Sequence, residues 1–285
     1  MNFKDIFKKF KENFLKFWRS GNTKISLVRD VFIALLLVLI ILSALWAYTG
    51  QWFGTPMVAI ESGSMMHENE PFGRYGTIDA GDMVFLVKVN SKNDISTYIE
   101  KDPDNYHYQN YGDVIVYRPY GNLDHDQIIH RAMCWVEYNE EYETYTVAGY
   151  GIYNETSVTI PELGLSGWTH PRYINNKPVT PHSGYFTKGD NPRTNTEADQ
   201  VSKQICLEPI KVEWISGKAR CELPWIGTLN LLFNDIISGR GTVGNVPSDS
   251  LICLVILIAI LISIPITLDL YGYYKEKKEE KEEEL

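Results

Sequence analysis

The sequence has few cysteines, and none of them are spaced as in a zinc-binding motif. Its four cysteines are Cys134, Cys206, Cys221 and Cys253, and no C-x-x-C spacing occurs, which argues against a zinc site. Cys253 lies in an apolar run and is expected to act as a small core hydrophobe. Cys206 and Cys221 could pair in an oxidising compartment, but their spacing of 15 residues leaves this open. We expect no metal and no organic cofactor.

The chain also lacks a basic region suited to nucleic acid. Its formal net charge is -9. Residues 1–30 carry eight Lys/Arg and three acidic residues, whereas residues 31–274 carry 15 basic and 27 acidic residues. An acidic central region argues against a nucleic-acid partner. No internal repeat is evident either, so a repeat architecture is not expected.

The first 27 residues predict a basic amphipathic segment on the cytoplasmic side. Five aromatic side chains recur every three or four positions, with lysines filling the other faces: Phe3, Phe7, Phe10, Phe14 and Trp18. Such a helix suits the interface of a membrane. Packing on the surface of a partner protein is the alternative.

Two apolar runs predict transmembrane helices at 28–48 and 250–270. The first apolar run, Val31 to Trp46, is interrupted only by Ser43. Its length is at the short end for a helix that spans a membrane. Small residues near its end also fit a cleaved signal peptide, but the thirty-residue leader and bulky Trp46 favour a retained anchor. Basic residues before the first run place the N-terminus in the cytoplasm. Two spans return the charged tail at 271–285 to the cytoplasm and leave 49–249 on the extracytoplasmic side.

Residues 49–249 predict a mainly β domain, a twisted sheet or partial barrel. Six segments are rich in β-branched and aromatic residues and are bounded by Gly, Asn, Asp and Pro clusters. They are Met83–Val89, Asp113–Tyr117, Gln127–Tyr138, Tyr142–Ala148, Tyr185–Thr187 and Ile210–Ile215. Few stretches have a helical period. Residues 90–111 and 149–184 are polar and turn-rich, and we interpret them as insertions.

One stretch of this domain has the residues of an activated nucleophile. An apolar run from Met57 breaks at Gly63 and presents Ser64 next. A serine needs a neighbouring base to act as a nucleophile. His130 ends the strand-like run Gln-Ile-Ile-His, where it could be held rigidly as a general base, whereas the other five histidines lie in polar stretches. From the residues alone, a purely structural histidine is the competing interpretation.

A third group is needed to orient the imidazole of such a base. Asp190 lies in Thr-Lys-Gly-Asp-Asn, and Asp199 follows in Glu-Ala-Asp-Gln. Composition alone favours a turn in which Asp190 caps backbone amides. The sequence therefore contains the parts of a serine hydrolase and leaves their geometry open.

Six short motifs, in this order, resemble the type I signal peptidases. They are Ser-Gly-Ser-Met, Gly-Asp-Met-Val-Phe, Gly-Asp-Val-Ile-Val-Tyr, Ile-His-Arg, Thr-Lys-Gly-Asp-Asn and Ile-Ser-Gly-Lys-Ala-Arg. The resemblance is to the archaeal and endoplasmic-reticulum branch, in which a histidine stands where bacterial enzymes use a lysine. Residues 223–235 are also similar to the C-terminal segment of that branch. The match covers about residues 57–235 in pieces.

The resemblance implies roles for five residues. Ser64 matches the family nucleophile and His130 the general base. Asp190 and Asp199 match the two acidic positions of the last motif. Which of them completes the triad stays open, but we favour Asp199 as the orienting residue and Asp190 as support. By analogy with the bacterial branch, Ser62 would assist the oxyanion hole.

The implied function is removal of N-terminal signal peptides from secreted preproteins by a membrane-bound serine endopeptidase. Its partners would be preproteins, the lipid bilayer of the cell or endoplasmic reticulum membrane and, if it works in a complex, other signal peptidase subunits. One rival is a membrane-tethered relative of the self-cleaving repressor peptidases, which would cut its own chain and usually use a lysine base. The other is a non-catalytic surface receptor or adhesin, which explains the aromatic loops but not the ordered motifs.

Overall fold

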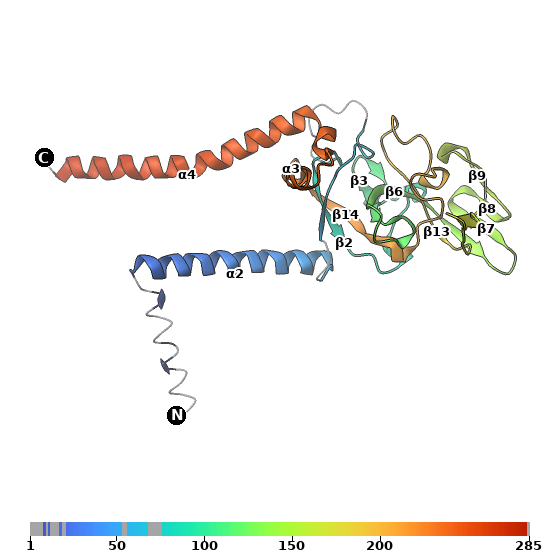
Figure 1. Ribbon diagram of the computed structural model, residues 1–285, viewed down its shortest axis with the longest axis horizontal. Coiled ribbons are helices and arrows are strands. Elements are labelled where there is room, and N and C mark those ends of the chain that lie inside the picture. Colours follow the sequence, from blue (N-terminus) through green and yellow to red (C-terminus); the bar gives the residue numbers. More distant parts are fainter. Residues whose placement is uncertain are drawn as a thin grey trace. The chain divides into compact units, whose positions relative to one another are not determined.

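The protein separates into two compact units, Met1–Gly54 and Thr55–Leu285. A computed structural model describes residues 8, 9, 11, 17, 18, 21–52, 56–67 and 76–283, and Figure 1 shows its elements. Most of the amphipathic segment expected at the N-terminus lies outside these residues, so the prediction for it stays a prediction.

The first unit contains the helix α2, Thr23–Thr49. It begins after Asn22, whose side chain accepts a hydrogen bond from the Lys24 amide at 3.0 Å, and it ends at Gly50 in the left-handed conformation, with φ 67°. Both are common helix caps. The caps extend the helix beyond the predicted 28–48. With a mean hydropathy of 2.8, α2 is long and apolar enough to cross a membrane.

The second unit ends in the helix α4, Ser248–Glu283, which includes the predicted span 250–270 and continues into the charged tail. Its stretch Ser248–Lys275 has a mean hydropathy of 3.1 and also meets the length of a membrane span. The helix passes through Pro265, near which Thr267 Oγ1 donates to the Ser263 carbonyl at 2.7 Å.

Between these helices the second unit is mainly antiparallel β-sheet, as predicted. The main sheet has the order β1-β2-β14-β5-β6-β7-β8, and β13 also pairs with β6. Its strands are β1 (Met57–Ala59), β2 (Met83–Val87), β5 (Val114–Tyr117), β6 (Ile128–Asn139), β7 (Thr144–Val147), β8 (Ile152–Glu155), β13 (Gly184–Lys188) and β14 (Ile215–Leu223). Within the described residues the sheet does not close into a barrel.

The predicted strand Ile210–Ile215 is wrong. Ile210 forms only an isolated bridge with Tyr185, and residues Val212–Trp214 form a 3-10 helix. The strand β14 begins at Ile215, where the prediction ended. This strand was not predicted because it has few β-branched residues. Its buried positions include Ile215, Gly217 and Ala219, and its partly exposed positions carry Ser, Lys and Arg.

The helix α3, Gly227–Ser238, was not predicted. Thr228 and Leu231 are buried against the sheet, whereas Phe233, Ile236 and Ile237 are 67%, 79% and 85% exposed. The helix is therefore apolar on its outer face as well. That pattern obscures the helical period on which the prediction relied.

The two expected insertions are folded parts of the domain. Residues 90–111 contain three short 3-10 helices and the hairpin of β3 (Tyr106–His107) and β4 (Asn110–Tyr111). Residues 149–184 contain β8, the hairpin of β9 (Val158–Ile160) and β10 (Leu165–Trp168), and the hairpin of β11 (Tyr173–Ile174) and β12 (Lys177–Pro178). Val158, Ile160 and Leu165 are at most 1% exposed and belong to the same apolar cluster as Phe186 of β13. The second insertion thus contributes to the core.

The cysteines are free thiols. Cys206, which the sequence allowed to pair with Cys221, is buried, and this burial raises the pKa of its thiol to about 12. It therefore packs as a small apolar side chain.

Candidate active site

The strand β6 carries two neighbouring residues that bind the two candidate aspartates. His130 pairs with Ile115 of β5, and Arg131 pairs with Val114 and with Lys188 of β13. Successive side chains of a strand point to opposite faces of the sheet. His130 and Arg131 therefore point in opposite directions, and each reaches a different carboxylate.

The imidazole of His130 is bonded to Asp199. Its Nδ1 atom lies 2.8 and 2.7 Å from the two carboxylate oxygens, and the side chains are only 3% and 1% exposed. Asp199 begins a short 3-10 helix, Asp199–Val201, which follows the loop after β13. A carboxylate at Nδ1 holds the proton there and leaves Nε2 able to accept another proton.

Two hydroxyl groups complete the surroundings of Asp199. Its Oδ2 atom accepts hydrogen bonds from the Tyr117 hydroxyl at 2.8 Å and from Thr187 Oγ1 at 2.7 Å. Burial, together with the nearby Asp199 charge, raises the pKa of Tyr117 well above its usual value, so Tyr117 stays a neutral donor. These hydrogen bonds therefore hold the Asp199 carboxylate within hydrogen-bonding distance of His130.

Ser64 and His130 line the same cleft, which has a volume of about 760 Å³. Ser62, β1 and Asn195 also line it. The Ser64 hydroxyl lies 3.3 Å from that of Ser62, and His130 Nε2 lies 3.5 Å from the Asn195 amide nitrogen. Among the described residues no hydrogen bond joins Ser64 to His130, so a reaction would require the serine side chain to turn toward the imidazole.

The backbone around Ser64 is held by the loop after β13. The Asn191 amide donates to the Ser64 carbonyl at 2.9 Å, and the Asn191 side chain donates to the Gly63 carbonyl at 2.6 Å. A Cβ atom at Gly189 would lie 2.5 Å from the Ser64 carbonyl, so only glycine fits at this approach. On the other side Met65 is 1% exposed and packs in the core. The hydroxyl of Ser64 is left facing the cleft.

Asp190 lies in this loop and binds Arg131, not His130. Arg131 Nε lies 2.9 Å from Asp190 Oδ1, its Nη2 binds Oδ2, and its Nη1 donates to the Gly112 carbonyl at 2.6 Å. Burial alone would raise the pKa of Asp190, but hydrogen bonds and charge from His67 and Arg131 outweigh it and hold this pKa below its usual value. Asp190 therefore fixes the loop that holds Ser64.

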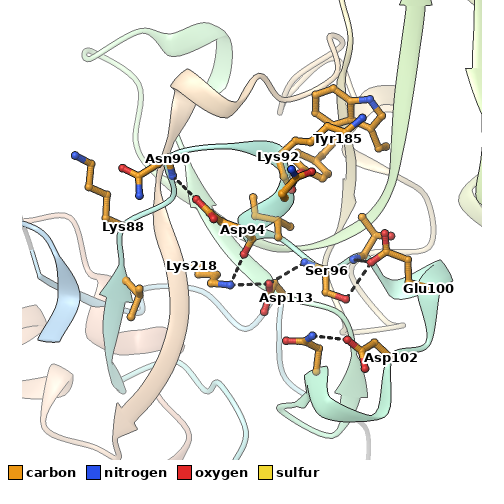
Figure 2. A pocket seen from close by; sticks show the side chains of 16 residues that line it. Lys88, Asn90, Lys92, Asp94, Ser96, Glu100, Asp102, Asp113, Tyr185 and Lys218 are labelled. Atoms are coloured by element: carbon orange, nitrogen blue, oxygen red, sulfur yellow. Dashed lines mark hydrogen bonds and ion pairs between the residues drawn. The ribbon is translucent and has the colours of Figure 1, made fainter.

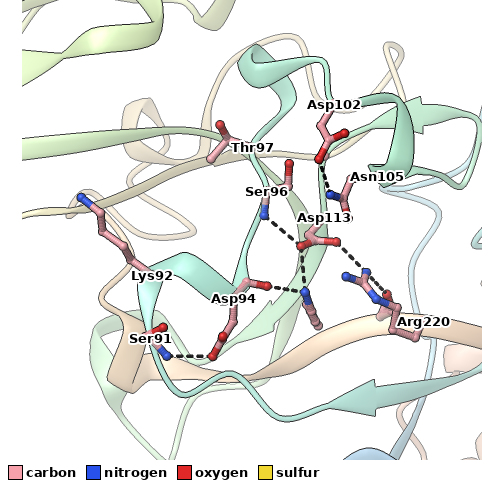
Figure 3. Close-up of polar contacts among 12 residues, drawn as sticks. Ser91, Lys92, Asp94, Ser96, Thr97, Asp102, Asn105, Asp113 and Arg220 are labelled. Carbon is pink, nitrogen blue, oxygen red and sulfur yellow. Dashed lines mark hydrogen bonds and ion pairs between the residues drawn. The ribbon is translucent and has the colours of Figure 1, made fainter.

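A third charged group supports the strand next to His130. Asp113 directly precedes β5 and is fully buried; its carboxylate lies 2.5 Å from Arg220 Nη1 and 3.2 Å from Lys218 Nζ. It also accepts a hydrogen bond from the Ser96 amide at 3.0 Å. Figure 2 shows Asp113, Lys218 and Ser96 at a polar pocket of about 630 Å³, and Figure 3 shows Asp113 between Ser96 and Arg220. Two cations neutralise this carboxylate, so the group ties β5 to β14.

Sequence reasoning missed several of these residues. Asp113, Tyr117 and Thr187 lie within motifs quoted for the family resemblance, and that was the signal that could have found them. Asn195 carries no such signal, because its place beside His130 depends on the path of the loop. No protein-family model matches the sequence, and a comparison with curated proteins gives no match.

Proposed function

We propose that this chain is a membrane-bound serine endopeptidase that removes N-terminal signal peptides from preproteins. The observation that carries the proposal is the shared cleft of Ser64 and the buried His130–Asp199 pair. An imidazole that is oriented by a carboxylate and lies near a serine hydroxyl is the arrangement used for acyl transfer on several unrelated folds. The motif resemblance narrows this class to the signal peptidases.

In the proposed reaction, His130 Nε2 takes the proton of the Ser64 hydroxyl as Ser64 attacks the substrate carbonyl. His130 then gives this proton to the leaving amine, and water releases the acyl-enzyme by the same route. The Ser64 amide and the Ser62 hydroxyl would stabilise the oxyanion, a role that fits the 3.3 Å separation of the two hydroxyls.

The short strand β1 supports a mode of substrate binding. It forms the end of the sheet order, pairs with β2 on one side only, and lines the cleft. An extended peptide can add to such an edge through backbone hydrogen bonds. The residues before the cut would then lie along β1, with small side chains next to the scissile bond as the family resemblance implies.

Two features support a location at the bilayer surface. Helices α2 and α4 are each long and apolar enough to span a membrane. The helix α3 exposes Phe233, Ile236 and Ile237, and residue 237 precedes the start of α4 by eleven positions. Such side chains suit the interface between lipid and water. We place the cleft on the extracytoplasmic side of the cell or endoplasmic reticulum membrane.

The test is cleavage of a model preprotein by the detergent-solubilised full chain. Ser64→Ala and His130→Ala should each lower the rate by several powers of ten. Ser166→Ala and His125→Ala are matched controls, because both residues are exposed and lie outside the cleft, and they should cleave like the wild type.

Other results would replace the proposal. Fragments of the enzyme itself that disappear with Ser64→Ala, without preprotein cleavage, would favour a self-cleaving peptidase. A folded wild type that cuts neither substrate, with or without added membrane extract, would favour a non-catalytic receptor.

A further inference from the structure

A second cluster of side chains, of types that bind metal ions, lies outside the cleft. His170 follows β10, His182 precedes β13, and Glu208 precedes the bridge between Ile210 and Tyr185. One potential ligand atom from each lies within 4.8 Å of the other two. Their separations along the chain match no metal-binding motif, so they were not grouped from the sequence.

Two of the three separations between the ligand atoms are close to those around a single metal ion. His182 Nε2 and His170 Nε2 lie 2.9 and 3.5 Å from Glu208 Oε2. A tetrahedral zinc ion with bonds of 2.0–2.1 Å places its ligand atoms about 3.3 Å apart, between these two values. The side chains of His170, Glu208 and His182 are only 0%, 8% and 14% exposed.

The other ring nitrogens indicate how the two histidines are protonated. His170 Nδ1 lies 2.9 Å from the Pro171 carbonyl, and His182 Nδ1 lies 3.0 Å from the Ser183 carbonyl. A carbonyl only accepts hydrogen bonds, so each Nδ1 carries a proton and each neutral ring directs the lone pair of Nε2 at Glu208. Histidines that bind metals commonly donate their second ring nitrogen in this way.

Without a cation this arrangement is unfavourable. Two lone pairs and a carboxylate oxygen, all acceptors, face one another, and among the described residues the buried His170 Nε2 has no hydrogen-bond partner. Protonating His182 alone would satisfy its 2.9 Å contact with Glu208 but leave His170 Nε2 unpaired, and protonating both rings would place two positive imidazoliums with centroids 4.7 Å apart beside one carboxylate. A divalent cation satisfies all three ligand atoms at once.

We infer that His170, His182 and Glu208 bind a divalent transition-metal ion, of which Zn²⁺ is the representative. Two imidazole nitrogens and one carboxylate oxygen form a donor set that such ions prefer, with a fourth position for water. This inference differs from the expectation that the protein needs no metal.

The position of the site indicates a structural role. The Glu208 carbonyl accepts a hydrogen bond from Gln200 Nε2 at 3.3 Å, and Gln200 Oε1 accepts one from the Thr187 amide at 3.0 Å. Gln200 directly follows Asp199. A metal ion would therefore link the insertion at 149–184, through Glu208, to the segment that carries Asp199.

The test is zinc binding by the tag-free full chain in detergent, first stripped with a chelator and then titrated by calorimetry. We expect about one equivalent of Zn²⁺ per chain and a melting temperature that rises with zinc. Co²⁺ should give the visible absorption of a site with nitrogen and oxygen ligands. Ser64→Ala should bind zinc like the wild type, so the result is independent of the proposed peptidase function.

Two variants and one control locate the binding. Removing a residue that only hydrogen-bonds to a metal ligand typically lowers metal affinity about 10–100-fold. His182→Ala and Glu208→Gln each remove a ligand itself, so each should lower zinc affinity at least about 100-fold. Glu208→Gln keeps the size of the side chain. The exposed His125→Ala should bind normally. A folded wild type that binds neither metal, or Glu208→Gln protein that binds zinc like the wild type, would overturn the inference.

Discussion

Asp190 and Asp199 lie nine positions apart in one segment, yet they have different partners and different consequences. Asp199 faces the imidazole of His130 and two hydroxyls, whereas Asp190 faces the guanidinium of Arg131. A guanidinium is permanently charged and donates its hydrogen bonds in a fixed planar geometry, so Arg131 holds Asp190 and its loop in place. An imidazole can gain and lose a proton near neutral pH, which is the property that the proposed general base requires. The comparison teaches that burial alone does not distinguish the carboxylate of the proposed triad from a structural one; the basic group beside it does.

The largest effect on the proposed activity is expected from replacing Asp199. Asp199→Asn should lower cleavage about 10³–10⁴-fold, because the amide no longer holds the Nδ1 proton and cannot stabilise the charged imidazole. KM should change little, since Asp199 does not line the cleft. Steady-state kinetics on the model preprotein measures both constants. A variant that keeps wild-type kcat would remove Asp199 from the mechanism.

Removing the carboxylate of Asp190 should act mainly on stability. Asp190→Asn leaves the buried Arg131 charge uncompensated and should lower the free energy of unfolding by about 3–5 kcal/mol. Denaturant unfolding measures it. Asp126→Asn is the matched control, because its pair with Arg240 is 84% and 57% exposed and should contribute little. Equal stability of the two variants would contradict a structural role for the Asp190–Arg131 pair.

A third buried carboxylate, Glu222 of β14, extends the comparison to pH. Burial, with the neighbouring charges of Asp82 and Asp79, raises the pKa of Glu222 to about 8. The folded state then binds a proton that the unfolded state has released, so stability should fall as pH rises from about 5 to 8, at up to about 1.4 kcal/mol per pH unit. Asp190, whose pKa is lowered, has the opposite sign: its contribution is lost as acid is added.

Glu222→Gln should flatten the fall between pH 5 and 8, as measured by melting temperature across that range. The same variant should leave the loss of stability in acid unchanged, because Asp190 is intact. A wild-type profile that is already flat from pH 5 to 8 would refute the raised pKa.

The smallest expected effect concerns the hydroxyls around Asp199. Tyr117→Phe removes one hydrogen bond to this carboxylate and should cost about 1.5–3 kcal/mol in unfolding free energy. Thr187 and His130 still bind Asp199, so the loss of cleavage should be far smaller than in Asp199→Asn. Kinetics and unfolding of the two variants, measured side by side, test this ranking.

The sequence predicts the parts of the fold that depend on local pattern. Strands β2, β5, β6 and β13 alternate or concentrate β-branched and aromatic residues, and both apolar helices follow from composition. The helix α3 was missed because its outer face is apolar too, and the core role of Val158, Ile160 and Leu165 because they lie among polar turns. Ser64 and His130 were proposed from motifs. The family resemblance favoured Asp199 over Asp190 as the partner of His130, whereas the common cleft of Ser64 and His130 depends on the path of residues 189–199, which no local pattern specifies.

The opposite directions of His130 and Arg131 along β6 also constrain how this chain can evolve. A one-residue shift of the strand moves every side chain to the other face. Depending on its direction, such a shift would place either Arg131 against Asp199 or His130 against Asp190, and in either case it would break both pairs. Sequences that descend from this one can therefore accept many substitutions in β6, but an uncompensated single-residue insertion or deletion that shifts His130 and Arg131 along the sheet would remove both pairs together.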